Sequence, residues 1–347
     1  MGDTKYHKIK DEEHSAVGNM VLTVGSEEGE KRVIAQAEGP AEALRKTVVT
    51  IALTILTSSQ GLLIALSKRS GHFNYSVTSA NFMVEVTKCT ISLASLLHIW
   101  QSTGITEDNR LSTNWGEIWV YPVPALLYLI KNLMQYFIFL YVDAPSYQIL
   151  KNLNIISTGV LYRIFLKKRL SEVQWSALVL LALGCTIAQM NNNSDRVLST
   201  PMLGVVLAVV MALLSGLAGV YTEMIIKKRP QRSIHVQNFY LYFFGILFNL
   251  VAICTYDYDA VFRKGFFAGY NWVTMIMILN HSLSGLAVSM VMKYANNIVK
   301  VYATSVAMLL TTIVSIPLFG FQLTLPFVLG TSVVCVAIFL HYQSKNK

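Results

Sequence analysis

Apolar residues form ten successive runs along the chain, each long enough to cross a membrane. A transmembrane helix needs roughly 20 mostly apolar residues, because the hydrocarbon layer is about 30 Å thick. The connections between the runs are short, so we expect successive helices to pack antiparallel. The ten predicted spans are 46–66, 76–100, 117–141, 145–166, 172–190, 201–225, 236–256, 272–292, 298–318 and 324–342. This pattern predicts an all-α polytopic membrane protein with ten transmembrane helices.

The composition supports this fold class and excludes others. Apolar residues make up 54% of the 347 residues and charged residues 14%, whereas soluble domains carry about 25% charged residues. The net charge of +9 comes from short basic clusters between apolar runs, which argues against a nucleic-acid-binding protein. The four cysteines lie inside apolar runs without C-x-x-C spacing. We therefore expect no metal site, no disulfide framework and no bound cofactor.

Lysine and arginine are distributed unevenly between the two sides of the predicted bundle. With the N-terminus in the cytosol, eighteen basic residues fall on the cytosolic side and five on the other. Such an excess marks the cytosolic side of membrane proteins. We therefore predict a disordered cytosolic tail over residues 1–44, a ten-helix domain over 45–342 and a cytosolic C-terminus over 343–347. Glycosylation sequons at Asn74 and Asn192 fall on the opposite side, and their occupancy stays open.

The two halves of the predicted bundle resemble each other. Leu170-Ser171-Glu172 opens the fifth span after a tight hairpin, and Leu323-Thr324-Leu325 opens the tenth in the same way, 153 residues later. We therefore divide the helices into a first repeat, 46–190, and a second, 201–342. An odd number of spans in each half inverts the second half in the membrane, and inverted repeats are a common transporter architecture with a binding site near the midplane.

Several polar residues fall inside the predicted spans. A buried lysine or glutamate costs about 2.5–3.5 kcal/mol on insertion scales, so it needs a partner or a water-filled cavity. Glu85 and Lys88 are three residues apart in the second span and can neutralise each other. Tyr147, Lys151 and Asn154 follow one face of the fourth span at helical spacing. A purely structural ion pair remains an alternative reading of Glu85 and Lys88.

Further polar positions occur in the third, seventh and ninth spans. Asn132 lies beside Lys131 in the third span. Lys131 is either a polar group of a binding site or a residue that packs at a helix bend. Asn238 and Tyr242 are four residues apart, and Lys300 has no acidic residue near it in sequence. Lysine suits a phosphate, tyrosine can stack on a base and asparagine can pair with a pyrimidine edge. The pattern favours a nucleotide site, and the missing G-x-x-x-x-G-K-[ST] motif argues against ATP-driven transport within this chain.

Four motifs resemble one known family, the nucleotide-sugar transporters, over residues 45–342. The closest branch is that of the Golgi CMP-sialic acid transporters, within the drug/metabolite transporter superfamily. The motifs are Asp143-Ala-Pro-Ser-Tyr147-Gln-Ile-Leu, Ser215-Gly-Leu-Ala-Gly-Val-Tyr221-Thr-Glu223, Lys293-Tyr-Ala-Asn-Asn-Ile-Val-Lys300 and Leu318-Phe-Gly-Phe-Gln-Leu-Thr324.

The resemblance implies ten helices in two inverted five-helix repeats that exchange a CMP-sugar for CMP across the Golgi membrane. It implies a sugar end at Glu85 and Lys88. Where this branch has a lysine seven residues after the fourth-span tyrosine, this chain has Asn154, and Lys151 one turn earlier on the same face is its expected replacement. The implied nucleotide-binding residues are Asn132, Tyr147, Lys151, Asn154, Asn238, Tyr242 and Lys300. The expected partners are CMP, a CMP-sugar and the lipid bilayer, with a homodimer as one option.

Two other functions stay open at this stage. A UDP-sugar/UMP antiporter would share most of these motifs, and the departure at Asn154 leaves the cargo sugar unassigned. A membrane-embedded transferase would need a converging acid, base or nucleophile. Glu85 and Glu223 are the only intramembrane acids, with Glu223 and Tyr221 readable as interfacial residues, and His281 is the only intramembrane histidine before the final span. These few residues do not form the converging acid, base and nucleophile that an enzyme would need.

Overall fold

The computed structural model of the protein describes residues 40–67, 74–112, 114–138, 141–142, 144–190, 201–319 and 324–344. Residues Gly39–Lys347 form one compact unit. The predicted tail up to residue 39 lies outside the described residues, as do the sequon at Asn192 and Asp143 of the first motif. Residues 40–44, predicted to belong to the tail, are helical instead.

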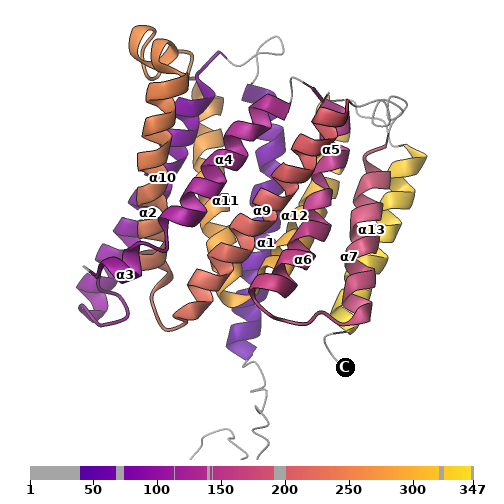
Figure 1. Cartoon of the computed structure of the whole chain (residues 1–347), viewed down its shortest axis with the longest axis horizontal. Coiled ribbons are helices and arrows are strands. Elements are labelled where there is room, and N and C mark those ends of the chain that lie inside the picture. The colour runs from indigo at the N-terminus through magenta and orange to yellow at the C-terminus, as the bar shows by residue number, and fades with distance from the viewer. Residues whose placement is uncertain are drawn as a thin grey trace, which may run out of the picture. The chain divides into compact units, whose positions relative to one another are not determined.

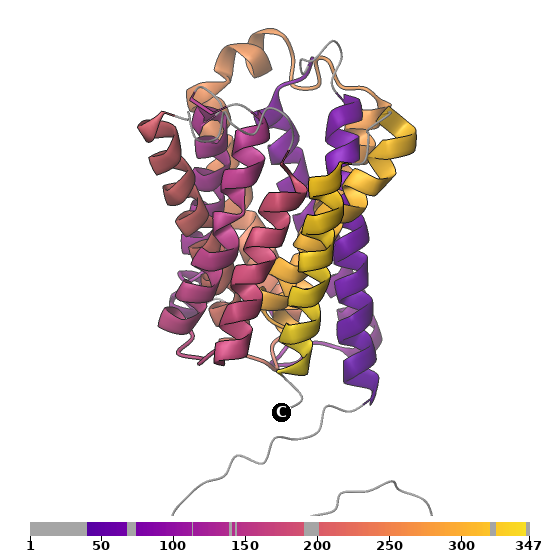
Figure 2. The same cartoon turned by 90° about the vertical axis from the view of Figure 1, so that its right-hand side faces the viewer.

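Every regular element of the described residues is a helix (Figure 1). The elements are α1 (Pro40–Ser67), α2 (Val77–Thr103), α3 (Trp115–Ile118), α4 (Pro122–Ile138), α5 (Ala144–Lys151), α6 (Leu153–Phe165), α7 (Glu172–Ala188), α9 (Met202–Lys228), α10 (Ile234–Tyr256), the π-helix η1 (Asp259–Arg263), α11 (Trp272–Tyr294), α12 (Asn297–Phe319) and α13 (Leu325–Gln343). The start of α1 and the end of α13 lie at the same end of the bundle (Figures 1 and 2).

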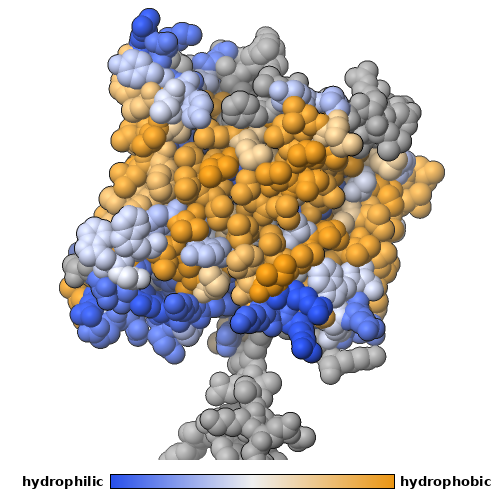
Figure 3. All heavy atoms as spheres, in the orientation of Figure 1, coloured by the Kyte–Doolittle hydropathy of each residue, from blue (hydrophilic) through white to orange (hydrophobic). Residues whose placement is uncertain are grey.

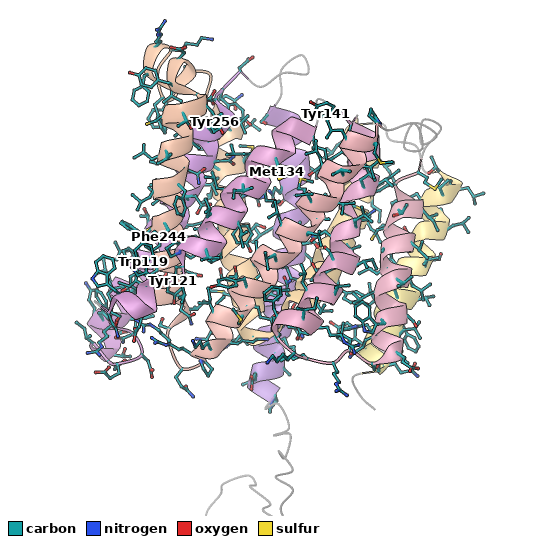
Figure 4. All side chains as sticks on the ribbon, viewed as in Figure 1. Trp119, Tyr121, Met134, Tyr141, Phe244 and Tyr256 are labelled. Atoms are coloured by element: carbon teal, nitrogen blue, oxygen red, sulfur yellow. The ribbon has the colours of Figure 1, made fainter. Side chains whose placement is uncertain are left out.

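Seven of the described helices are long and apolar enough to cross a membrane: α1, α2, α9, α10, α11, α12 and α13. A hydrophobic band covers the middle of the bundle, and hydrophilic residues gather toward its ends (Figure 3). Aromatic side chains mark both borders of this band, with Trp119 and Tyr121 toward one end and Tyr141 and Tyr256 toward the other (Figure 4). Tryptophan and tyrosine are enriched at membrane–water interfaces. The protein is therefore an all-helical polytopic membrane protein, as the sequence predicts.

The predicted span 117–141 is interrupted near its start. The short helix α3 ends at Ile118, and α4 begins only at Pro122. Proline suits a helix start, because its φ angle is already helical and its missing N–H would have no partner there. Glu117 therefore lies in a connection before the spanning helix.

The predicted span 145–166 consists of two helices, α5 and α6, separated by a turn at Asn152. The Asn152 side chain donates hydrogen bonds to Thr186 Oγ1 at 3.3 Å and Gln189 Oε1 at 3.0 Å, in and just after α7. These two hydrogen bonds hold the turn between α5 and α6 against the end of α7. The backbone of Asn152 itself stays in the αR region, with φ −64° and ψ −17°, so the predicted span continues through a tightened turn rather than as one uninterrupted helix.

Small residues allow close packing of α9 against α6. A Cβ atom on Gly216 would lie 3.0 Å from Leu161 Cδ1 and 3.1 Å from Ser157 Oγ. The Ser157 hydroxyl donates to the Ala212 carbonyl at 2.9 Å. The remaining extensive helix contacts are α7 with α13, α1 with α11 and α12, α2 with α10 and α11, and α4 with α9 and α10.

Helices α2 and α10 are joined at both ends. The Asp257 carboxylate, just after α10, accepts hydrogen bonds from Ser76 Oγ at 2.8 Å and from Thr78 Oγ1 at the start of α2. At the other end, the Ser233 N–H donates to the Asp108 carbonyl at 2.8 Å. These contacts hold the two helices together although more than a hundred residues separate them in sequence.

A carboxylate with two arginine partners joins α3 to the α9–α10 connection. Glu117 Oε2 lies 2.7 Å from Arg229 Nη1 and 2.6 Å from Arg232 Nη1. Hydrogen bonds from Arg229, Ser112 and Arg232 lower the pKa of Glu117 from 4.5 to about 2. The Arg232 carbonyl also accepts a hydrogen bond from Lys293 Nζ at 3.0 Å, at the end of α11. Three connections at this end of the bundle are thereby held together.

Candidate functional site

An ion pair lies within α2, as the i,i+3 spacing predicts. Lys88 Nζ is 2.6 Å from Glu85 Oε1, and Lys88 is buried. The same ammonium group lies 4.4 Å from the ring centroid of Tyr242 on α10, in cation–π geometry. The Tyr242 hydroxyl in turn lies 3.0 Å from Ser289 Oγ on α11. The structure therefore brings a predicted sugar-binding residue into contact with a predicted nucleotide-binding residue.

Two glycines make room for this ion pair. A Cβ atom on Gly245 of α10 would lie 2.8 Å from Glu85 Oε2, and one on Gly285 of α11 would lie 2.8 Å from Lys88 Cδ. Real Cβ atoms almost never approach so closely. Both charged side chains are thus seated in notches that any larger residue would fill, which fixes the pair between three helices.

Three lysines from three different helices form a second cluster, here called the three-lysine cluster: Lys131 of α4, Lys151 of α5 and Lys300 of α12. Lys131 interacts electrostatically with both other ammonium groups. Within the described residues, none of the three lies within ion-pair distance of a carboxylate. Lys151 is exposed and the other two are half-buried, so a ligand could reach them. Glu223 acts electrostatically on Lys300 from beyond ion-pair distance. Three cations near one another favour an anion, and lysine is a suitable phosphate ligand.

A buried carboxylate joins α9 to the connection between α11 and α12. Glu223 is fully buried, and its Oε1 lies 2.7 Å from Lys227 Nζ. Its Oε2 accepts a hydrogen bond of 2.7 Å from the Asn297 N–H, at the first residue of α12. Lys227 Nζ also donates to the Ala295 carbonyl. These residues are called the α9–α12 bridge below, and Glu223 is buried inside the protein near the end of α9.

Gly219 allows α9 to approach the first turn of α12. A Cβ atom at this position would lie 2.7 Å from Asn297 Oδ1 and 2.9 Å from Lys300 Nζ. The Asn297 side chain is fully buried, and its carboxamide has no hydrogen-bond partner among the described residues. An unpaired buried amide is costly. Beside a lysine without an ion-pair partner, it indicates a site completed by a polar ligand.

A small cavity lies between α4, α9 and α10 and involves a further predicted residue. Asn238 is 1% exposed and lines this cavity together with Tyr121, Thr222 and Gln237. Among the described residues, the Asn238 carboxamide oxygen has no hydrogen-bond partner, and neither does the Gln237 carboxamide. The accessible lining of this cavity is almost entirely apolar, so the two carboxamides lie beside an apolar space between the helices.

The remaining predicted residues are less clearly placed for binding. Tyr147 is 3% exposed and packs with Ala208 and Met211 of α9, so in this conformation its ring face is covered. A base could stack on Tyr147 only after a rearrangement. The Asn154 side chain accepts a hydrogen bond from Thr158 within α6, and Asn132 is half-buried on α4.

Sequence reasoning missed three residues of these clusters as site residues: Lys131, Glu223 and Asn297. The i,i+4 spacing of Glu223 and Lys227 is a signal that could have found the α9–α12 bridge. No signal in the sequence indicates that Lys131 lies within electrostatic range of two lysines from distant segments. All four cysteines are free thiols. Among the described residues, no three His, Cys, Asp or Glu side chains are grouped to hold a metal ion.

Comparisons with known proteins identify the family of this chain. The family model described as nucleotide-sugar transporter matches residues 41–342. "CMP-sialic acid transporter 2" of Oryza sativa subsp. japonica is 60% identical over 98% of both chains. "CMP-sialic acid transporter 4" of Arabidopsis thaliana is 59% identical over 98% of this chain and 99% of its own. "Probable UDP-sugar transporter protein SLC35A4" of Xenopus tropicalis is 36% identical over 86% and 92%.

A solved crystal structure has the same fold. It superimposes with a TM-score of 0.63 over 85% of this chain and 96% of its own, at 10% sequence identity. A likeness at that identity concerns the fold alone. The relatives are named as transporters, so the family is not one of enzymes. Together, the family match over most of the length and the relatives at 60% identity show that this chain belongs to the nucleotide-sugar transporter family.

Proposed function

We propose that the protein is a Golgi antiporter that exchanges a cytosolic CMP-sugar for lumenal CMP. The cargo would be CMP-sialic acid or a similar CMP-linked acidic sugar. Relatives that cover nearly the whole chain carry the name CMP-sialic acid transporter. The observation that carries the proposal is the three-lysine cluster, because three cations with no carboxylate within ion-pair distance fit the phosphate that CMP and a CMP-sugar share.

The proposal includes ten spans in two inverted repeats. The spans would be α1, α2, α4, α5 with α6, and α7 in the first repeat, and α9, α10, α11, α12 and α13 in the second. This arrangement makes α1 equivalent to α9, α2 to α10, α4 to α11, α6 to α12 and α7 to α13. The packing supports this equivalence, because helix pairs that the two repeats would relate are both in contact. The pair α1–α11 corresponds to α4–α9, α1–α12 corresponds to α6–α9, and α2–α11 corresponds to α4–α10.

The orientation follows from the basic residues. The clusters Lys167–Arg169 and Lys227–Arg229 belong to the side on which eighteen of the lysines and arginines fall. This side would face the cytosol. Protease protection of tags at the two termini, in sealed Golgi vesicles, tests the orientation: both tags should be digested.

Alternating access requires that contacts at one end of the helices break while those at the other end form. The α9–α12 bridge ties the second repeat together at the end that carries Lys227. It lies one helical turn from Gly219, where Lys300 approaches α9. Binding of a phosphate by Lys300 would therefore act directly on the contact between α9 and α12 and provides a route from cargo binding to movement.

Counterflow tests the function. Purified protein in proteoliposomes preloaded with CMP should take up labelled CMP-N-acetylneuraminate, and empty liposomes should take up little. Uptake that does not depend on internal CMP would contradict antiport. Uptake of a UDP-sugar driven by internal UMP, without response to CMP, would favour the second candidate, a UDP-sugar/UMP antiporter, which the 36% identical UDP-sugar relative supports.

A further inference from the structure

One polar pair near the centre of the membrane takes no part in the site described so far. Gln60 of α1 and His281 of α11 are hydrogen-bonded, with Gln60 Nε2 2.8 Å from His281 Nδ1. His281 is the tenth of the 23 residues of α11, so it lies near the middle of that helix. Both side chains are half-buried rather than sealed in the protein. Polar residues at this depth are costly and usually serve a function.

The pair has hydrogen-bonding capacity left over. If the Gln60 amide donates to Nδ1, a neutral imidazole carries its proton on Nε2, and the Gln60 carbonyl oxygen remains an acceptor. If the amide is turned round, Nδ1 donates to the carbonyl oxygen, Nε2 becomes an acceptor and the amide nitrogen a donor. In either arrangement the pair presents one ring nitrogen and one amide group, of opposite hydrogen-bonding character. A sugar hydroxyl is both donor and acceptor and matches this combination.

The position of the pair relative to Lys88 and Tyr242 can be derived from the residues along one face of α11. His281, Gly285 and Ser289 are spaced by four residues and therefore lie on one face, each about 6 Å from the next. Lys88 lies over Gly285, and the Tyr242 hydroxyl bonds to Ser289. Along this face the order is thus Tyr242, then Lys88, then His281. The ammonium groups of Lys88 and Lys131 also act electrostatically on the imidazole.

We propose that Gln60 and His281 bind hydroxyl groups of the cargo sugar, one helical turn beyond Lys88. This inference rests on the proposed function and on the roles that the family resemblance implies, with Tyr242 at the nucleotide and Lys88 at the sugar, where its ammonium group would pair with the carboxylate of an acidic sugar. The sugar extends from the carboxylate contact along α11 toward the pair, where its hydroxyls meet one donor and one acceptor. CMP ends before this point and does not reach the pair. Gln60 and His281 therefore determine specificity for the sugar and not for the nucleotide.

A neighbouring contact provides a matched control. Ser59 Oγ lies 3.0 Å from Asn280 Oδ1, so it joins the same two helices through the adjacent residues. Ser59→Ala removes a hydrogen bond between α1 and α11 but leaves Gln60 and His281 in place. A purely structural role of the pair would make Ser59→Ala and Gln60→Leu behave alike.

The experiment compares CMP with CMP-N-acetylneuraminate for the full-length protein in proteoliposomes and in thermal-shift titrations. Gln60→Leu and His281→Phe should each weaken uptake and binding of CMP-N-acetylneuraminate by about tenfold, the scale of one or two lost hydrogen bonds. The dissociation constant for CMP should stay within about twofold of wild type, which also shows that the variants fold. The double exchange Gln60→His with His281→Gln restores both groups and should recover part of the lost sugar binding.

Two outcomes would overturn the inference alone. If the variants lost CMP and CMP-N-acetylneuraminate binding equally, the pair would belong to the nucleotide site or to the fold. Gln60→Leu and His281→Phe should weaken CMP-N-acetylneuraminate binding more than CMP binding. If this difference were no larger than the difference measured for Ser59→Ala, the pair would not bind the sugar. A wild-type protein that binds neither ligand would instead refute the proposed function, and the inference with it.

Discussion

Gly219→Ala adds one methyl group where α9 meets the first turn of α12. The new carbon would lie 2.7 Å from Asn297 Oδ1 and 2.9 Å from Lys300 Nζ, so both groups must move. The Lys300 ammonium is the end of a flexible chain and can shift at small cost. We therefore expect the substitution to change the position of the binding groups more than it changes the fold.

The magnitudes separate these two effects. Alanine in a helix is favoured over glycine by about 1 kcal/mol, and an extra methyl group in a packed contact costs about 1–3 kcal/mol. The net loss of stability for Gly219→Ala is therefore about 0–2 kcal/mol. Displacing Lys300 from a phosphate removes a charged hydrogen bond of about 1.5–3 kcal/mol. That loss corresponds to a CMP dissociation constant raised about 10- to 150-fold.

The assay is a thermal-shift titration of purified protein with CMP, which yields the melting temperature and the dissociation constant together. Gly61→Ala is the matched control, because Gly61 also lies inside a long helix and its added Cβ would meet only Thr311 Cγ2, at an ordinary 3.4 Å. This control should bind CMP as the wild type does. Equal CMP affinity of Gly219→Ala and wild type would refute the reasoning, since Lys300 would then not bind the ligand from its place beside α9.

Four further outcomes are expected. Lys300→Ala should abolish exchange in proteoliposomes while the protein still folds, and an unchanged CMP affinity would contradict phosphate binding by this lysine. Lys88→Ala should weaken CMP-sugar uptake by about tenfold or more, the scale of a charged contact, and leave CMP binding nearly intact; equal losses for both ligands would contradict a separate sugar contact. CMP should stabilise the protein far more than GMP, because Asn238 and Tyr242 suit a pyrimidine, and equal stabilisation would exclude that selectivity. The lowered pKa of Glu117 means that its arginine contacts contribute stability above pH 4.5 that is lost as the pH falls toward about 2. Glu117→Gln should accordingly lower the melting temperature at about pH 6 and have little effect near pH 2, and a difference independent of pH would show that the charge is not responsible.

The helix pattern was predictable because it depends on local apolar runs. The seven long helices fall on seven of the ten predicted spans. The interruptions at Asn152 and before Pro122 were harder to predict, since Asn152 is fixed by contacts with α7 and the apolar run continues through both places. Hydropathy does not respond to such turns.

The site was predictable only where its geometry lies within one helix. The Glu85–Lys88 pair followed from spacing alone and is confirmed at 2.6 Å. The three-lysine cluster joins segments that are far apart in sequence, so one sequence cannot indicate that Lys131 belongs to it. The ring of Tyr147 is covered by Ala208 and Met211 of α9, a contact between distant segments that one sequence does not specify.

The pairing of α2 with α10 has a consequence for synthesis. The ribosome adds the 153 residues between Thr103 and Tyr256 in roughly 8–30 s, at about 5–20 residues per second. During that time α2 must remain in the bilayer without α10, and Lys88 without the Tyr242 ring. Glu85 on the same helix neutralises the lysine throughout, so α2 can enter the lipid as a single unit. The same delay applies to α1 and α4, whose partners α11 and α9 also come later. A chain cut short after α7 would leave α1, α2 and α4 without the helices they pack against, for membrane quality control to remove.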